Sequence, residues 1–426
     1  MPGMFVMKRL HCIMVRKKSL ILGAVFALVC LAAVVAAPAL FVPQTPVAGT
    51  GDGASYIILA ASPSGMKCYQ SDFSVYMLLP PGSDLRAQVI RREGEETELV
   101  TGGIEVRYEI ISNTTSAGKT NFWEYAADYG YDVEPDKGVT GSGLSGTMKL
   151  SEDGRFYEAK GIPLTPYNDG SNTPNPYQLA RITVTDTRTG KVLAGTDEAV
   201  VPVSDEMECG MCHGRENTDM YILRAHDRLL GTDLVQRFET GNRPACINCH
   251  REDVLGQPDK EGAPPFSEAI HGSHADRMDR SETEPVCYSW HPGPVAKCYR
   301  GRMYLAGISC GSSECHGSMS NVSKTQAGGR AAWAQEPDCG QCHGSLYAAN
   351  AKKLYRDSFL NNSDAPAMNG ILLCTTCHNS PHAEWRSSLP KDNLLPTGLL
   401  GYPNFIDKCS VCHEGMGMGR VHAGSE

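Results

Sequence analysis

Hydrophobic and polar residues alternate with a period of two in several short runs between about Tyr56 and Val203. Around Ile104 to Ile110 every second residue is apolar, which predicts a strand with one buried and one solvent-facing side. The runs expected to form strands are Phe73 to Leu79, Leu85 to Ile90, Gly103 to Ile110, Tyr177 to Asp186 and Lys191 to Val203. Turn sequences such as Pro-Pro-Gly at 80–82 separate them, so we expect an all-β, sandwich-like domain.

The composition changes after Val203, because most of the 17 Cys and 13 His lie between Cys209 and His413. We expect this part to be a Cys- and His-rich domain of short helices and loops with little regular structure, held together by groups bound to those residues rather than by a large apolar core. The predicted organisation is two-domain. It comprises 1–42 as a targeting segment, 43–55 as a Pro- and Gly-rich linker, 56–203 as the β-sandwich-like domain and 204–426 as the cofactor domain.

The N-terminus has the pattern of an export signal. An uncharged apolar run from Leu20 to Val42 follows a cluster of basic residues, namely Lys8, Arg9, Arg16, Lys17 and Lys18. The run is either a signal peptide removed near Ala36 and Ala37 or an anchor in the inner membrane, since it is long enough to span a bilayer. In both cases the rest of the chain faces the periplasmic or cell-surface side.

Five segments have the pattern Cys-x-x-Cys-His. They are Cys209-Cys212-His213, Cys246-Cys249-His250, Cys339-Cys342-His343, Cys374-Cys377-His378 and Cys409-Cys412-His413. Two thiols at this spacing reach the two vinyl groups of one haem, and the following His supplies an axial imidazole to its iron. Zinc binding and dithiol redox chemistry are the alternatives, but neither requires a His directly after every second Cys. The pattern therefore predicts haem c at all five segments.

Two further segments depart from this spacing. Cys310 and Cys315, followed by His316, have four residues between the thiols, and we interpret them as a sixth haem site. In the segment from Cys287 to His291, Trp290 stands where the second Cys would be. We expect six haems, with a seventh at Cys287 and His291 as an open alternative. If the seventh is absent, a disulfide between Cys287 and Cys298 is reasonable in an oxidising compartment.

Several stretches resemble a family of bacterial multihaem c-type cytochromes. The resemblance is found in Ser-Asp-Glu-Met-Glu-Cys at 204–209, Cys-Tyr-Ser-Trp-His-Pro-Gly-Pro at 287–294, Lys-Cys-Tyr-Arg-Gly at 297–301 and Cys-Thr-Thr-Cys-His-Asn-Ser-Pro-His-Ala-Glu at 374–384, and it includes Thr114 to Trp123. Members of that family carry a β domain ahead of a haem domain and typically have Cys at the position of Trp290. The resemblance implies the same two-domain order here.

Each haem iron needs a second axial ligand unless it binds substrate there. The histidines outside the attachment segments are candidates for this distal position: His226, His271, His274, His382 and His422. His382 follows His378 by four residues, so both lie on one helical face and His382 should serve a neighbouring haem. His271 and His274 could likewise serve two adjacent haems. Surface histidines are the alternative for each of them.

Three functions remain open at this point. The first is electron transfer between redox partner proteins through closely spaced haems. The second is reduction of a small nitrogen or sulfur compound at one open haem, for which no catalytic residue is identified. The third is a haem-bearing subunit of a filament or membrane complex. The net charge of -9 disfavours nucleic acid as a partner.

Overall fold

The computed structural model describes residues 47–48, 53–94, 96–207, 209–214, 216–252, 255, 257, 261–278, 287–313, 315–330 and 372–414. Residues 1–43 and 44–426 are two separate units, and the structural account below concerns the second. The expected signal or anchor at 1–42 lies outside the described residues. Within the described ranges, no helix has the length and apolar character needed to cross a membrane.

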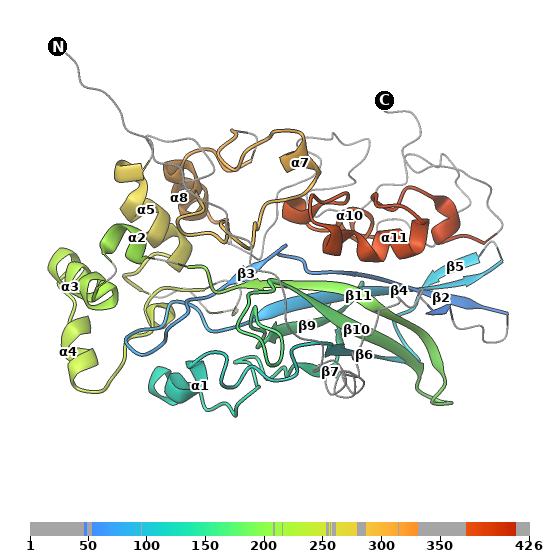
Figure 1. Ribbon diagram of the computed structural model, residues 1–426, viewed down its shortest axis with the longest axis horizontal. Helices are drawn as coiled ribbons and strands as arrows, with labels where there is room; N and C mark the ends of the chain where they lie inside the picture. The colour runs from blue at the N-terminus through green and yellow to red at the C-terminus, as the bar shows by residue number, and fades with distance from the viewer. Residues whose placement is uncertain are drawn as a thin grey trace, which may run out of the picture. The chain divides into compact units, whose positions relative to one another are not determined.

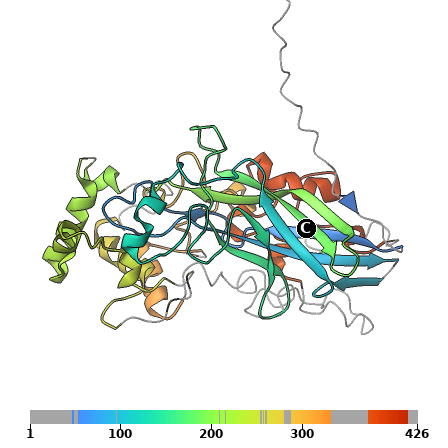
Figure 2. The same ribbon diagram turned by 90° about the horizontal axis from the view of Figure 1, so that it is seen from below.

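Two β-sheets form the N-terminal part of the second unit (Figures 1 and 2). The first sheet has the order β1-β11-β10-β6-β7, with β3 parallel to β11, and the second has the order β2-β4-β9-β8, with β5 beside β4. The strands of the first sheet are β1 (Val47–Ala48), β3 (Lys67–Cys68), β6 (Ile104–Ile110), β7 (Ser145–Thr147), β10 (Tyr177–Asp186) and β11 (Val192–Ser204). Those of the second are β2 (Ser55–Ala61), β4 (Ser83–Glu93), β5 (Glu96–Leu99), β8 (Lys149–Leu150) and β9 (Tyr157–Ile162).

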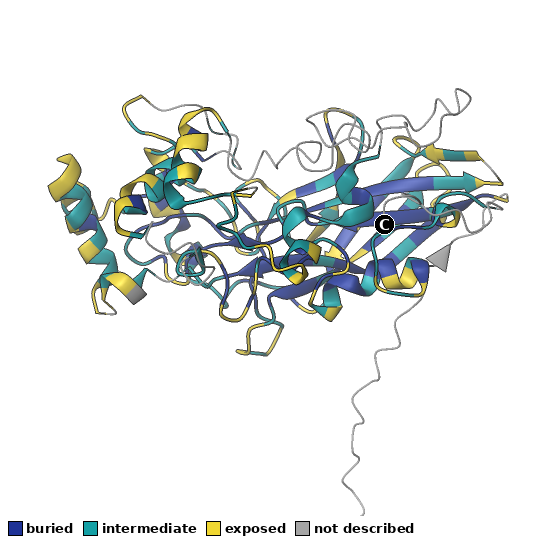
Figure 3. Ribbon diagram, turned by 90° about the horizontal axis from the view of Figure 1, so that it is seen from above, coloured by how far each residue is buried: buried dark blue, intermediate teal, exposed yellow. Residues whose placement is uncertain are grey.

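The two sheets share one apolar core. Val106 and Ile182 from the first sheet and Val89 and Ile90 from the second are completely buried and belong to the same cluster. Figure 3 shows the buried residues concentrated along the strands. Along β6 buried and exposed residues alternate after Val106, as the period of two predicts. The prediction of a β region with two layers is therefore confirmed.

Four of the five predicted strands are present, but the prediction for Phe73 to Leu79 was wrong. The backbone hydrogen bonds of this stretch go elsewhere: the side chain of Gln70 donates to the Tyr76 carbonyl and accepts from the Leu78 amide, both at 2.6 Å. Met77 exchanges backbone hydrogen bonds with the segment around Ala245 in an isolated parallel bridge. The apolar residues thus anchor a loop rather than a strand.

Seven of the strands in the described part of the chain were not predicted: β1, β2, β3, β5, β7, β8 and β9. In β2 the residues from Ile57 to Ala60 are all buried, so the strand lacks the alternation that identified the others. β1 lies inside the expected linker 43–55 and pairs with β11 through Val47 and Gly195. Part of the predicted linker is therefore a strand of the first sheet.

The C-terminal part has short helices and long irregular stretches, as expected. Its α-helices are α2 (Gly210–His213), α3 (Thr218–Leu230), α4 (Leu234–Glu239), α5 (Phe266–Met278), α7 (Arg302–Leu305), α8 (Met319–Ala327), α10 (Cys374–His378) and α11 (Leu394–Leu400). Short 3-10 turns occur at η2 (Cys246–Asn248), η6 (Pro381–Ala383), η7 (Pro390–Asn393) and η8 (Cys409–Val411), while α1 (Phe122–Tyr125) and η1 (Ala126–Tyr129) belong to the β region. α5 packs against α8, α10 contacts β2 and α11 contacts β11.

The composition changes where β11 ends, at Ser204, but the protein interior continues across that point. Ile247 and Val411, which are spacer residues inside two Cys-x-x-Cys-His segments, belong to the same apolar cluster as the sheets. The fully buried Arg300 forms an ion pair with Asp392 at 2.6 Å and donates to the Gly65 carbonyl at 3.0 Å. The Cys-rich segments therefore pack against the β region, in addition to being joined to it by the chain.

Candidate functional site

The Cys-x-x-Cys-His segments that the structure describes share one local backbone conformation. In three of them the His amide donates to the carbonyl of the first Cys: His213 to Cys209 at 3.1 Å, His250 to Cys246 at 2.8 Å and His413 to Cys409 at 2.8 Å. The amide of the second Cys donates to the same carbonyl in each case. In the fourth segment, Cys374–His378, the same residues form the helix α10. A single helical turn therefore presents both thiols and the imidazole side by side.

The structure also describes the two segments that depart from the regular spacing. In the widened segment the Cys315 amide donates to Ser312 at 2.9 Å, so the turn is closed from Ser312 rather than from Cys310. In the segment with Trp290, the amides of Trp290 and His291 donate to the Cys287 carbonyl at 3.1 Å and 2.9 Å. Cys339, Cys342, His343 and His422 lie outside the described residues.

Four pairs of histidine rings face each other across similar distances. Each pair joins one His from an attachment segment to one predicted distal candidate. The ring centroids are 6.1 Å apart for His213 and His274, 6.4 Å for His250 and His226, 6.1 Å for His291 and His271, and 6.0 Å for His316 and His382. All four described distal candidates occur in these pairs, and each faces a different segment. His226 is on α3, His271 and His274 are on α5, and His382 is in η6.

These distances fit an iron atom between the two rings. An imidazole nitrogen lies about 2 Å from a first-row metal and about 1.1 Å from the centre of its own ring, so two trans imidazoles have centroids about 6.3 Å apart. Aromatic rings in ordinary contact have centroids about 4.5–7 Å apart, so a single distance in this range also fits a packing contact. The repetition of one spacing in four pairs, each joining a His of a Cys-His segment to a distal candidate, favours a shared ligand between the rings. The residues present therefore fit a bis-histidine haem.

The second nitrogen of several rings is held by the hydrogen bond expected for a metal ligand. Nδ1 of His271 lies 2.7 Å from the Ser267 carbonyl, and Nδ1 of His274 lies 2.8 Å from the Ile270 carbonyl. Nδ1 of His250 lies 2.8 Å from the Pro264 carbonyl. Because a carbonyl only accepts, Nδ1 carries the proton and Nε2 keeps the lone pair that binds a metal.

His226 has the same tautomer, but its Nδ1 is hydrogen-bonded to a side chain instead of a carbonyl. Its Nδ1 lies 2.8 Å from Oγ1 of Thr232, whose hydroxyl donates to Asp227 Oδ1 at 2.6 Å. Since that hydroxyl proton is already used, Oγ1 accepts from Nδ1, and Nε2 of His226 is again unprotonated. Thr232 and Asp227 are supporting residues that the sequence pattern did not identify.

His382 is held by the β region. It is hydrogen-bonded to the backbone of Ser64, in the turn before β3. The adjacent Gly65 has a φ of +74°, and a Cβ there would lie 3.1 Å from His382 Cβ and 2.7 Å from Ser380 Oγ. Glycine is therefore required for this close approach. Nothing in the sequence of the sheet domain pointed to this role.

Desolvation disfavours the protonated form of His291, His316 and His382, and so lowers the pKa of each. Desolvation, followed by the neighbouring histidines, lowers the pKa of His291 to about 3 and that of His316 to about 4. The pKa of His382 is also lowered to about 4, first by burial and then by His291. Neutral imidazole is the form that binds iron, so these surroundings favour ligation over protonation.

The last two described segments have different neighbours. His378 stacks on Phe405 with ring centroids 4.8 Å apart, and its Nδ1 lies 3.2 Å from Oε1 of Glu384. A carboxylate in that position makes an imidazole a stronger electron donor. Nδ1 of His413 is buried with no hydrogen-bond partner among the described residues.

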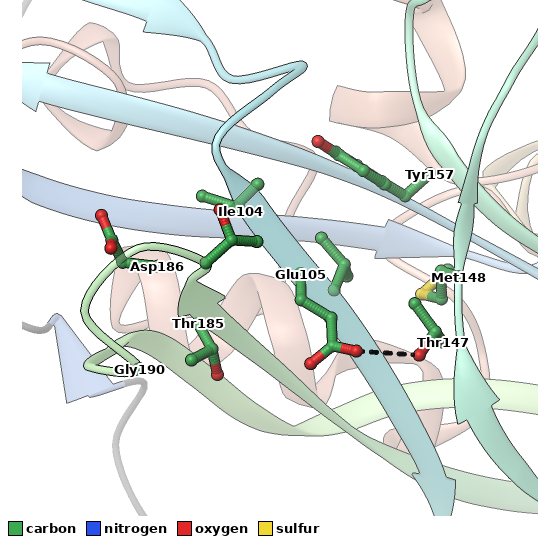
Figure 4. Close-up of a pocket in the computed structure, with 10 residues that line it drawn as sticks. Ile104, Glu105, Thr147, Met148, Tyr157, Thr185, Asp186 and Gly190 are labelled. Atoms are coloured by element: carbon green, nitrogen blue, oxygen red, sulfur yellow. Dashed lines mark hydrogen bonds between the residues drawn. The ribbon is translucent and has the colours of Figure 1, made fainter.

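A surface pocket of about 460 Å³ lies over β6, β7 and β10 (Figure 4). Glu105 and Thr147, which are hydrogen-bonded at 3.2 Å, are among its lining residues, and Asp186 lies at its other side. It contains none of the predicted Cys or His sites. Across the described part of the chain, no group of three or more His, Cys, Asp or Glu side chains is arranged to hold a bare metal ion.

No protein-family model, curated protein or solved structure matches this chain.

Proposed function

We propose that this chain is an exported multihaem c-type cytochrome that transfers electrons through covalently bound haems. The observation that carries the proposal is the pairing of the histidines at three regular or widened attachment segments, His213 with His274, His250 with His226 and His316 with His382. In each pair the separation of the rings equals the distance across a six-coordinate iron, and the segment supplies thiols beside one ring.

The residues have distinct roles in this proposal. The thiols of Cys209, Cys212, Cys246 and Cys249 would each form a thioether, as would those of Cys374, Cys377, Cys409 and Cys412 and of the widened pair Cys310 and Cys315. Haem c supplies a one-electron Fe(II)/Fe(III) couple when bound. Both imidazoles of a pair would hold the iron, which would favour low-spin iron at low potential and leave no position for substrate. The segment Cys339–His343 would add a sixth site of the same kind.

Neighbouring sites are close enough to influence one another. The Cys209 thiol contributes to the raised pKa of Cys246 after desolvation, and both Cys pack in one cluster with Tyr76. Cys412 likewise contributes to the raised pKa of Cys377. The first and second segments are therefore neighbours, as are the fourth and fifth regular ones. Closely spaced redox centres suit electron transfer from one to the next.

The β region serves as a scaffold in this proposal. Met77 fixes the second segment, because the Cys246 amide donates to its carbonyl at 2.8 Å. Arg92, from β4, donates to the Val411 carbonyl inside the last segment at 3.0 Å. The same region can also dock redox partner proteins or a larger membrane or filament assembly, the role considered from its sequence.

Replacing one distal histidine tests the assignment. In the haem-loaded protein, His274→Ala should convert one low-spin iron to an open one that binds carbon monoxide in the reduced state, while the other irons stay unchanged. Asp276→Asn, an exposed change on the same helix, is the matched control and should bind no additional carbon monoxide. A His274→Ala protein with the spectrum of the parent would contradict the assignment. Carbon monoxide binding by the parent would favour the reductase alternative.

A further inference from the structure

The segment from Cys287 to His291 has the geometry of an attachment site although it lacks the second Cys. The amides of Trp290 and His291 donate to the Cys287 carbonyl at 3.1 Å and 2.9 Å. The corresponding distances in the segment from Cys246 to His250 are 3.1 Å and 2.8 Å. Trp290 thus occupies the backbone position of the second Cys, and the turn that presents Cys287 beside His291 is unchanged.

His291 also has a distal partner. The ring of His271, on α5, faces it with centroids 6.1 Å apart and an angle of 27° between the ring planes. This separation matches those of the other three pairs. Nδ1 of His271 is held by the Ser267 carbonyl at 2.7 Å, so its Nε2 is available toward His291.

The surroundings hold His291 in place. A Cβ on Gly293 would lie 2.1 Å from Cγ of Tyr288, so the turn after His291 closes tightly against that ring. Tyr288 donates to the Tyr299 carbonyl at 3.4 Å. His291 itself is exposed. A histidine that only packs in a core would have its ring covered.

Trp290 lies between two pairs. Its ring contacts that of His274, the distal partner of His213, with centroids 5.4 Å apart. His271 and His274 are three residues apart on α5, so the two pairs are adjacent and the indole fills space next to both. The change from Cys to Trp therefore adds an aromatic contact to the neighbouring site while leaving the pair of His271 and His291 intact.

We infer that His271 and His291 ligate a seventh haem, which is attached through a single thioether at Cys287. The inference rests on the proposed function. The S–H bond of Cys287 adds across one vinyl group: sulfur bonds to one vinyl carbon, the hydrogen goes to the other, and no oxidant or reductant is consumed. The second vinyl group stays intact beside Trp290. The alternative for a site without haem, a disulfide between Cys287 and Cys298, is not formed in this structure.

The test counts covalent haems in the exported, matured full chain by intact-protein mass spectrometry under denaturing conditions. The parent should carry seven, Cys287→Ser should carry six, and Cys298→Ser, the control, should carry seven. If the parent carries six covalent haems and Cys287→Ser also carries six, this inference is overturned but the proposed function is not. A parent with none overturns the proposed function as well.

Two further measurements do not depend on how well the Cys287→Ser variant folds. Peptide mapping of the parent should find one haem on the peptide that contains Cys287, with Trp290 unmodified. Trp290→Cys should keep the count at seven and shift the reduced pyridine haemochrome band toward shorter wavelength, because a second vinyl group becomes saturated. A haem-free Cys287 peptide, or an unshifted band in Trp290→Cys, would contradict the single thioether.

Discussion

The two regions of this chain are stabilised in different ways. In the β region, residues from both sheets, such as Val89 and Ile182, are completely buried in one continuous core. In contrast, the 13-residue α3 buries only Leu223, while Leu229 and Leu230 near its end are 67% and 66% exposed. Apolar burial accounts for the order of the β region but not for that of α3. We therefore expect the helices that carry the distal histidines to depend on the proposed haems.

The largest expected effect follows from removing the cofactor. When the chain is made without export and haem attachment, amides in β4 and β10 should remain protected from hydrogen exchange while those in α3 and α5 exchange at least about 100-fold faster than in the matured protein. The reason is that α3 and α5 have few buried apolar contacts of their own. Equal protection of α3 in both preparations would mean that its order does not need haem.

One buried ion pair holds the guanidinium that links the two regions, because Arg300 also donates to the Gly65 carbonyl of the β region at 3.0 Å. Arg300 and Asp392 have side chains that are each 1% exposed. Asp392→Ala should lower the free energy of unfolding by about 3–5 kcal/mol, because it leaves a buried guanidinium without its partner. Asp233→Ala, which breaks an exposed pair with Arg237, is the control and should cost about 0.5 kcal/mol or less. Denaturant titration measures both, and equal costs would contradict the assignment.

The core of the β region should tolerate truncation poorly. Ile182 is completely buried between the sheets, so Ile182→Ala should cost about 2–4 kcal/mol through lost burial and a residual cavity. Val192, which is 54% exposed at the start of β11, provides the control. Val192→Ala should change the thermal midpoint little. A small effect of Ile182→Ala would show that the core repacks.

The smallest effect concerns pH. Burial, followed by Asp197, raises the pKa of Glu198 to about 7, and its Oε2 has no hydrogen-bond partner among the described residues. The folded state therefore binds this proton more tightly than the unfolded state, and stability falls as pH rises from about 4.5 to 7. Glu198→Gln should raise the free energy of unfolding by about 1–2 kcal/mol at pH 8 and leave it unchanged at pH 4. A gain of the same size at both pH values would contradict this origin.

Local patterns predicted more of the molecule than long-range ones. The alternation around Val106 identified β6, and the spacing of Cys and His identified the attachment segments, since both signals lie within a few residues. Which distal histidine faces which segment depends on how α3 and α5 pack, and this could not be predicted. The contact of Ser64 with His382 joins residues more than 300 positions apart, so no local pattern could reveal it. β2 was missed because its continuous apolar run resembles any buried segment.

The seventh site shows the same limit. Trp290 stands where the second Cys of the attachment pattern would be, so the sequence predicts six haems and leaves a seventh at Cys287 and His291 as an alternative. The pairing of His271 with His291 became visible only when α5 was placed beside that segment. The spacing of Cys and His led to the hypothesis of haem attachment, but it could not show which irregular segment has a histidine partner.

Covalent attachment of haem at the regular segments is the central claim, and extraction of the purified, exported protein with acidified organic solvent tests it most directly. The account predicts that the pigment stays with the protein and that the intact mass corresponds to at least six attached haems. A colourless protein, or pigment that passes into the solvent, would contradict it.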